Sequence, residues 1–290
     1  MNNRKGIVLA GGKGSRLYPI TEAVSKQLLP IYDKPMIYYP ITTLMSIGIR
    51  DILIITTPQD QNKFKHLLND GKQWGVHFEY KVQEEPKGIA QALTIGEDFL
   101  GNAPSVLILG DNLFHGASLQ KVFNEGNKRK DGATIFAYPV KDPERYGVVD
   151  FNEEGLVLDI EEKPEFPKTN YAITGIYFFD NSIIKKALKV KLSKRGEYEI
   201  TDINKMYLEE KSLHVEIMGR GTAWLDTGNH DSLHEASGYI KTLENRQGLK
   251  VGCPEEISWR NGWINNNQFR ELATNLKSST YGKYLLNLIS

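Results

Sequence analysis

The first half of the chain alternates short apolar runs with stretches of helical periodicity. The apolar runs predict buried strands at 6–10, 51–57 and 105–110. Apolar residues spaced about 3.6 positions apart predict helices at 35–47, 61–68 and 88–100. Nearly continuous apolar strands that alternate with helices are typical of a parallel sheet covered on both faces. The pattern therefore predicts a doubly wound α/β fold.

After about residue 130 the pattern changes to shorter β segments separated by turns. Strands are predicted at 134–140, 147–151, 156–161 and 171–179, with a hairpin-type turn at 152–155. Helical periodicity returns at 233–243 and 265–288. We predict an α/β protein with a Rossmann-like, doubly wound mixed sheet. A main domain would cover 1–232, divided near residue 130, and a helical C-terminal region would cover 233–290.

The composition is that of an ordinary globular protein. It argues against nucleic-acid-binding, membrane-bound and disulfide-stabilised secreted proteins. Of its 290 residues, 36 are Lys or Arg and 36 are Asp or Glu, so the formal net charge is zero. Such a chain has no overall attraction to nucleic acid or to an anionic membrane. The single cysteine, Cys253, cannot form an intramolecular disulfide, and the run 6–10 is too short for a signal-peptide core. We expect a cytoplasmic protein without nucleic-acid or membrane partners.

The segment Leu9-Ala-Gly-Gly-Lys-Gly-Ser-Arg-Leu17 follows the first predicted strand and suggests a phosphate cradle. Its glycines let exposed N–H groups approach an anion, and Lys13 and Arg16 add charged donors. The spacing is not that of a Walker A loop, and Leu17 occupies the third glycine position of a dinucleotide fingerprint. Asp33, about 20 residues on, lies in a turn, which further weakens a dehydrogenase reading. The alternative to a phosphate-binding loop is a tight strand-to-helix turn that binds nothing.

Ordered motifs along almost the whole chain resemble the sugar-nucleotide pyrophosphorylases, a group of nucleotidyltransferases. The matching segments are 9–21, 25–41, 83–92, 109–116, 143–149, 161–164, 173–177, 195–202, 223–228 and 253–260. The resemblance is greatest to members that join dTTP to α-D-glucose 1-phosphate, giving dTDP-glucose and pyrophosphate, the first step toward dTDP-rhamnose or related deoxysugars. Other members use UTP or other sugar phosphates. A uridylyltransferase and a non-catalytic nucleotide-sugar sensor therefore stay open.

The resemblance implies a Mg²⁺ site formed by Asp111 and Asp226. Asp111 follows an apolar run, and open α/β sheets bind ligands at the carboxyl ends of their strands. An isolated aspartate is often only a turn or cap residue. Arg16 would stabilise charge on the reacting phosphates, and Lys163 would hold the sugar phosphate. Because that phosphate is already an anionic nucleophile, no general base is required.

The resemblance also implies the remaining binding positions and divides the main domain into a nucleotide-binding part, about 1–130, and a sugar-binding part, about 131–232. Nucleotide binding is expected from Leu9, Gly11, Gly12, Gly14, Ser15, Arg16, Lys26, Gln27, Gln83 and Gly88. Sugar-phosphate binding is expected from Asn112, Arg145, Gly147, Glu162, Lys163, Ile173 and Arg195. An amide such as Gln83 can pair with the thymine edge, and Glu162 can accept hydrogen bonds from sugar hydroxyls. The alternative interpretation is that Lys26 and Glu162 are solvated surface side chains with no role in binding.

Arg220 and Arg260 match a regulatory site between the subunits of a homotetramer, with dTDP-rhamnose as the expected feedback ligand. His115 stands where other members often carry tyrosine. His230 and His234 are four residues apart and could form a zinc pair, although solvated or core histidines are the expected reading.

Overall fold

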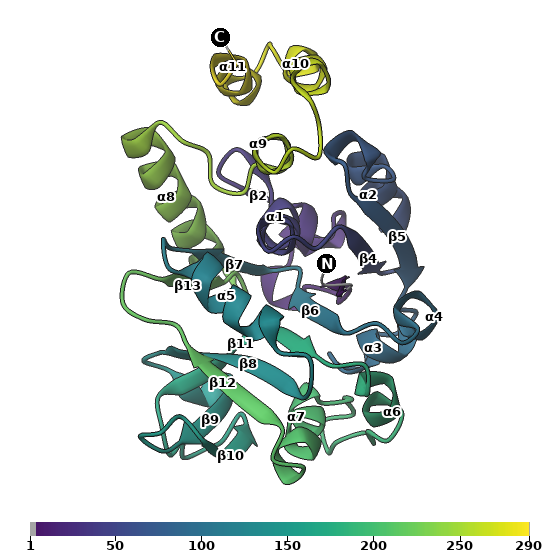
Figure 1. The fold of residues 1–290 in the computed structure, drawn as a ribbon, viewed down its shortest axis with the longest axis vertical. Helices are drawn as coiled ribbons and strands as arrows, with labels where there is room; N and C mark the ends of the chain where they lie inside the picture. Colours follow the sequence, from purple (N-terminus) through teal and green to yellow (C-terminus); the bar gives the residue numbers. More distant parts are fainter. Residues whose placement is uncertain (1–3, 290) are drawn as a thin grey trace.

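The computed structural model describes residues 4–289 and is organised around a nine-stranded mixed sheet (Figure 1). Its parallel part consists of β1 (Lys5–Ala10), β4 (Asp51–Thr56), β5 (His77–Val82) and β6 (Ser105–Leu109). The remaining strands are β8 (Ala133–Pro139), β9 (Gly147–Phe151), β10 (Val157–Glu162), β11 (Tyr171–Phe179) and β12 (Leu213–Ile217). Strand β11 pairs antiparallel with β6 and joins the two parts. The predicted mixed α/β sheet is confirmed.

Alternate residues of the central strands supply two separate cores, one on each face of the sheet. Ile7 of β1 belongs to one core and Val8 to the other, because successive side chains of a strand point to opposite faces. The Ile7 face is covered by α3 (Gln91–Ile95), α4 (Glu97–Leu100), α6 (Ile183–Ala187) and α7 (Ile200–Glu209). The Val8 face is covered by α1 (Tyr38–Ser46), α2 (Gln61–Leu68) and α5 (Leu119–Lys128).

Several short strands and 3-10 helices lie between the longer elements along the chain. A two-stranded antiparallel ribbon is formed by β7 (Asn112–His115) and β13 (Ala223–Asp226). A second small ribbon pairs β2 (Pro30–Ile31) with β3 (Lys34–Pro35). The 3-10 helices are η1 (Ser15–Leu17), η2 (Ile20–Glu22), η3 (Lys26–Leu28), η4 (Lys72–Trp74) and η5 (Pro143–Arg145).

The C-terminal region is helical, as predicted, and stands at one end of the molecule in Figure 1. It contains α8 (His230–Gln247), α9 (Pro254–Arg260), α10 (Asn266–Asn275) and α11 (Thr280–Asn287). Its small core includes Cys253, Phe269 and Leu285. The boundary expected at 232/233 falls within the first turn of α8 and stays a prediction.

Three predicted helices begin later than expected or are interrupted. The helix expected from residue 35 begins at Tyr38, because Lys34 and Pro35 pair with β2. The helix expected over 88–100 is divided at Gly96, where a Cβ would lie 2.8 Å from Ile7 Cδ1. The helix expected over 265–288 is interrupted, because Ser279 caps a new helix by accepting a hydrogen bond from the Gly282 amide.

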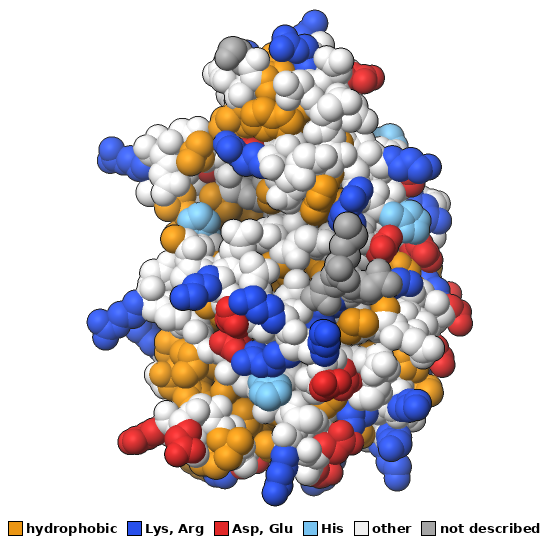
Figure 2. Space-filling view, in the orientation of Figure 1, with side chains coloured by type: hydrophobic (Ala, Val, Ile, Leu, Met, Phe, Trp, Pro, Cys, Tyr) orange, Lys and Arg blue, Asp and Glu red, His pale blue; other side chains and the backbone are white. Residues whose placement is uncertain are grey.

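The distribution of surface charge and the polarity of the helices agree with the zero net charge and ordinary hydrophobic content of the chain. On the face shown in Figure 2, Lys and Arg side chains are interspersed with Asp and Glu and do not gather in one broad patch. Among residues 4–289, no helix has the length and apolar character that crossing a membrane requires.

Candidate active site

Two aspartates from distant parts of the chain are brought together by the β7–β13 ribbon. Asp111 lies between the end of β6 and the start of β7. Asp226 ends β13 and is the register partner of Asn112. Thr227 fixes this junction, because its amide and its Oγ1 donate to the Asp111 carbonyl at 3.3 and 2.9 Å. Asp111 and Asp226 therefore line the same cleft.

The electrostatic environments of these two carboxylates differ. Burial opposes ionisation of Asp111, but an ion pair with Lys26 at 2.5 Å and a 2.9 Å hydrogen bond from Asn112 Nδ2 lower its pKa overall. Burial and the negative charge of Asp111 raise the pKa of Asp226 to about 6, although Lys26 and Arg16 partly offset this. Because the two carboxylates repel each other beside the glycine loop, binding of a cation at this site would be favourable.

The predicted glycine loop packs against the predicted base-reading residue. Gly12 and Gly14 have φ values of 106° and 59°, which favour glycine. At Gly11 a Cβ would lie 2.3 Å from Gln83 Oε1, so any larger residue would displace the Gln83 side chain. Gln83 Nε2 also donates to Gln91 Oε1 at 2.7 Å. The glycine loop and Gln83 are therefore in direct contact.

Other residues expected to bind nucleotide lie around the same loop. Lys26 is buried, which is unusual for lysine, and its charge is met by Asp111. A Cβ at Gly110 would lie 2.9 Å from the Leu9 carbonyl and 3.0 Å from Gln27 Cγ, so these two residues flank the approach to Asp111. Gly88 has a φ of 104°, and its close neighbour is the backbone of Tyr198. That contact gives Gly88 a structural reason to be glycine, independent of any bound base.

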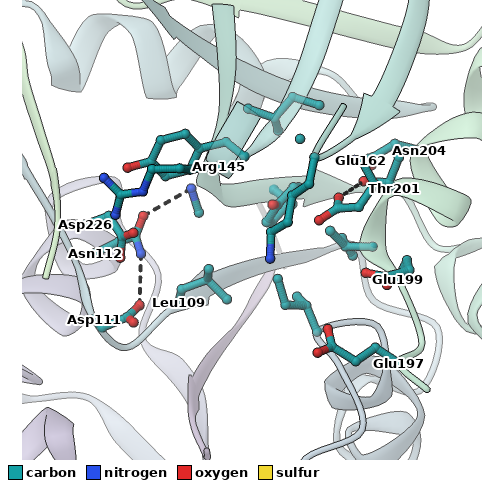
Figure 3. Close-up of a pocket in the computed structure, with 18 of the residues that line it drawn as sticks. Leu109, Asp111, Asn112, Arg145, Glu162, Glu197, Glu199, Thr201, Asn204 and Asp226 are labelled. Carbon is teal, nitrogen blue, oxygen red and sulfur yellow. Dashed lines mark hydrogen bonds between the residues drawn. The ribbon is translucent and has the colours of Figure 1, made fainter. Parts of the chain in front are cut away.

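The cleft that contains Asp111 and Asp226 joins a charged end to a polar end. Ten of the predicted site residues line it: Arg16, Asp111, Asn112, Arg145, Gly147, Glu162, Lys163, Ile173, Arg195 and Asp226. Figure 3 shows Asp111, Asn112, Asp226 and Arg145 at one end, and Glu162, Thr201 and Asn204 at the other. The other residues expected to bind nucleotide lie outside this lining: Leu9, Gly11, Gly12, Gly14, Ser15, Lys26, Gln27, Gln83 and Gly88.

Glu162 is held in place at the polar end. Its Oε2 accepts a hydrogen bond from Thr201 Oγ1 at 2.5 Å, and its Oε1 lies 3.3 Å from a guanidinium nitrogen of Arg195. A Cβ at the opposite position, Gly147, would lie 3.3 Å from Glu162 Oε2. Arg195 also pairs with Glu197 and Glu199, so a phosphate at Arg195 would compete with three carboxylates.

Lys163 and Arg145 enter the cleft from the chain segments at the edge of the sheet. Lys163 directly follows β10 and has a φ of 44°, an unusual backbone conformation for lysine. The conformation is fixed by its amide, which donates to the Tyr146 carbonyl at 3.0 Å. Strained backbone of this kind often occurs at functional sites. Arg145 pairs with Asp142 at 2.6 Å and contributes positive charge near Asp226.

Several cleft residues were not selected from the sequence: Ile89, Tyr146, Tyr177, Glu197, Glu199, Thr201, Asn204 and Trp224. Tyr177, Thr201 and Trp224 lie inside the motifs that resemble the pyrophosphorylases, so the sequence contained the information needed to select them. Trp224 Nε1 donates to Asn112 Oδ1 at 2.5 Å and orients the amide that holds Asp111. Asn204 lies outside the motifs, on a helix that periodicity did not reveal.

A second cavity lies between α1, β7 and α9, away from the cleft. Its lining includes His115, Gly116 and Arg260. Burial lowers the pKa of His115, and Arg260 pairs with Glu256 at 2.7 Å. Arg220 is exposed and outside this lining, but the turn that follows it touches the cavity, since a Cβ at Gly116 would lie 2.8 Å from the Gly221 carbonyl.

The donor set of the charged end suits a metal that retains other ligands. Within residues 4–289 no group of three or more His, Cys, Asp or Glu side chains is placed to hold a metal ion alone. His230 and His234 are accordingly exposed residues of α8 without such a cluster. Two carboxylates leave most of the coordination sphere to water and phosphate oxygens, as Mg²⁺ prefers.

The family model for nucleotidyl transferases matches residues 5–242, and the chain belongs to that family. More particular likenesses are to proteins named glucose-1-phosphate thymidylyltransferase. One from Xanthomonas campestris pv. campestris is 58% identical over 99% of this chain and 98% of its own length. One from Mycobacterium tuberculosis is 54% identical over 98% of this chain and 99% of its own length. The resemblance to the sugar-nucleotide pyrophosphorylases is confirmed.

Solved structures extend the likeness to the fold. A Bacillus anthracis structure, assigned as a glucose-1-phosphate thymidylyltransferase in complex with sucrose, has a TM-score of 0.76 and 44% identity. It covers 81% of this chain and 94% of its own. A UDP-glucose pyrophosphorylase complexed with UDP-glucose has a TM-score of 0.72 and 27% identity, covering 83% of this chain and 99% of its own.

Replacing Asp226 by asparagine should stabilise the metal-free protein above pH 6. The folded-state pKa is raised from 3.8 to about 6, so ionisation of Asp226 costs folding free energy. The penalty appears as the pH rises from about 4 to about 6 and then stays constant. It corresponds to at most about 3 kcal/mol. Urea unfolding with EDTA at pH 4 and pH 7.5 measures it, and Asp226→Asn should gain stability only at the higher pH.

The exposed Asp131 supplies the matched control for that experiment. Asp131→Asn removes the same charge from the surface and should change the free energy of unfolding by less than about 0.5 kcal/mol at either pH. If Asp226→Asn is no more stable than the unmodified protein at pH 7.5, burial and the charge of Asp111 do not raise the pKa of Asp226 as described.

Proposed function

We propose that the protein transfers the deoxythymidylyl group of dTTP to α-D-glucose 1-phosphate, forming dTDP-glucose and releasing pyrophosphate. The observation that carries the proposal is the cleft itself, with two aspartates and basic residues at one end and hydroxyl-binding groups at the other. Relatives 58% and 54% identical over nearly the whole chain bear the name of this activity. We further propose that the reaction is the first step toward dTDP-rhamnose or a related deoxysugar, in the cytoplasm.

Asp111 and Asp226 are proposed to hold Mg²⁺. The raised pKa of Asp226 supports this assignment, because a divalent cation would offset both of its causes, burial of the carboxylate and the neighbouring charge of Asp111. When bound, the metal ion would neutralise phosphate charge and orient the nucleotide. Lys26, which pairs with Asp111, would contribute positive charge for the nucleotide phosphates.

The chain's own residues bring two anions into line. Arg16 at the loop would hold the leaving phosphates, and Lys163 at the end of β10 would hold the sugar phosphate. An oxygen of that phosphate attacks the α-phosphorus, and the bond to the leaving pyrophosphate breaks. Catalysis then rests on positioning and charge stabilisation, as in other phosphoryl-group transfers. Gln83, fixed beside Gly11, would read the thymine edge.

A matrix of nucleotides against sugar phosphates tests the proposed function. Pyrophosphate release should be fastest with dTTP and glucose 1-phosphate, and EDTA should abolish it. Faster release with UTP would instead indicate a uridylyltransferase, the activity related to the UDP-glucose pyrophosphorylase of similar fold. Absence of release with every pair would favour a nucleotide-sugar sensor.

Lys163→Ala should weaken the use of the sugar phosphate selectively. Loss of a charge-assisted hydrogen bond is worth about 1.5–3 kcal/mol, so the KM for glucose 1-phosphate should rise about 10- to 100-fold. The KM for dTTP should change much less. Lys168→Ala is the control, because Lys168 pairs with Asp159 outside the cleft and should be silent. Equal increases in both KM values would contradict the assignment of Lys163 to the sugar phosphate.

We propose that the second cavity, with Arg260 and the neighbouring Arg220, binds a downstream dTDP-sugar and that the protein is a homotetramer. The cavity supports this through its position near both arginines and away from the cleft. His115 lines this cavity, and by the family resemblance it stands where other members often carry an aromatic residue such as tyrosine.

Inhibition by dTDP-rhamnose tests the regulatory proposal. The rate should fall with rising dTDP-rhamnose, and Arg260→Ala should shift the inhibition curve to higher concentration by about tenfold, the worth of one charged contact. Arg246→Ala, at the exposed end of α8, should leave the curve unchanged. A rate that stays constant at saturating dTDP-rhamnose would exclude the feedback site, and sedimentation velocity would report the assembly.

A further inference from the structure

Asn204 is a buried amide whose polar atoms lack partners at the inner wall of the cleft. Its side chain is fully buried in α7, and neither Oδ1 nor Nδ2 has a hydrogen-bond partner among the described residues. It nevertheless belongs to the lining of the cleft. Burying an unpaired amide opposes folding, so nearly all buried amides have at least one partner. An exception at the wall of a cleft indicates a bound ligand that supplies the missing hydrogen-bond partner.

The position of Asn204 is set by α7, which packs against β10. Asn204 follows Thr201 by three residues, so the two side chains lie on the same side of the helix. Thr201 Oγ1 is satisfied by Glu162 at 2.5 Å, whereas Asn204 has no such partner. In Figure 3 Asn204 lies beside Thr201 and Glu162, at the end of the cleft opposite Asp111 and Asp226.

The chemistry around Asn204 indicates what kind of group it would meet. Asp111 and Asp226 lie at the other end of the cleft, and the charge of Arg16 acts on Asp226 there, so that end suits phosphates. Beside the Glu162–Thr201 pair, the guanidinium of Arg195 is already engaged by three carboxylates. A neutral group with hydroxyls therefore fits better than an anion. An amide offers both a donor and an acceptor, which matches a hydroxyl group.

We propose that Asn204 determines sugar specificity by hydrogen-bonding one hydroxyl of the hexose, beside the Glu162–Thr201 pair. The proposal rests on the proposed function, since it takes the hexose 1-phosphate to be the ligand of this end. It assigns Asn204 to recognition of the neutral ring and leaves the phosphates to the charged end.

The experiment compares the full-length enzyme with Asn204→Leu, which keeps a similar volume and removes the amide. Rates are measured with glucose 1-phosphate and with the analogues lacking the 2-, 3-, 4- or 6-hydroxyl. The kcat/KM for glucose 1-phosphate should fall about tenfold. For one deoxy analogue it should stay unchanged, because the hydroxyl that Asn204 recognises is already missing. The KM for dTTP should not move, and the Tm should not fall, because no native hydrogen bond is lost.

Ser105→Ala is the matched control. Ser105 also carries a buried unpaired polar atom, but it lies at the start of β6 and outside the cleft lining. It should not change the pattern across the sugar analogues. Asn204→Ala repeats the test if the leucine variant does not fold. An equal fall for every sugar phosphate, or a lowered Tm with unchanged selectivity, would overturn the proposal and make Asn204 a packing residue.

Failure of the proposed function would be visible separately. An enzyme that does not turn over dTTP with glucose 1-phosphate would fail before any variant is compared. Titration calorimetry with glucose 1-phosphate and its deoxy analogues would then measure the same discrimination as binding. Loss of discrimination for a single analogue in Asn204→Leu would still support the assignment, and identical affinities in both proteins would reject it.

Discussion

The structure depends on holding two like charges close together beside an anion-binding loop. Burial and the negative charge of Asp111 together raise the pKa of Asp226 to about 6, so the two carboxylates are costly to hold ionised in one place. Left alone, such a pair would separate, so the fold must fix both ends. The β7–β13 register, the Thr227 hydrogen bonds to the Asp111 carbonyl and the Lys26 ion pair do this. The free energy stored in the pair becomes available when a cation and phosphates arrive.

The sheet makes that fixation possible. Parallel strands β1 and β6 are buried on both faces and end at the same edge, so the glycine loop and Asp111 emerge side by side. Glycines then allow the loop to pack directly on Gln83, where a Cβ would collide. A rigid scaffold of this kind places catalytic groups with little reorganisation during the reaction.

Sequence reasoning predicted the parts whose signals are local. The long apolar runs identified β1, β4 and β6, and the motifs located Asp111, Glu162 and Lys163. The ribbon that joins Asp226 to Asn112 was not predicted, because strands of four residues carry no periodic signal. Asn204 was missed for a different reason. Its interest lies in an unpaired amide, which only the surrounding packing reveals.

The division of the cleft explains how one site can treat two ligand groups differently. Phosphates are multiply charged and bind through charge, which is strong but insensitive to the sugar attached. Discrimination between hexoses must come from neutral contacts, because epimers carry the same charge. Buried polar groups such as Asn204 and the Glu162–Thr201 pair are suited to this, since a mismatched sugar would leave them unpaired. The charged end would thus set the reaction and the polar end would set the substrate.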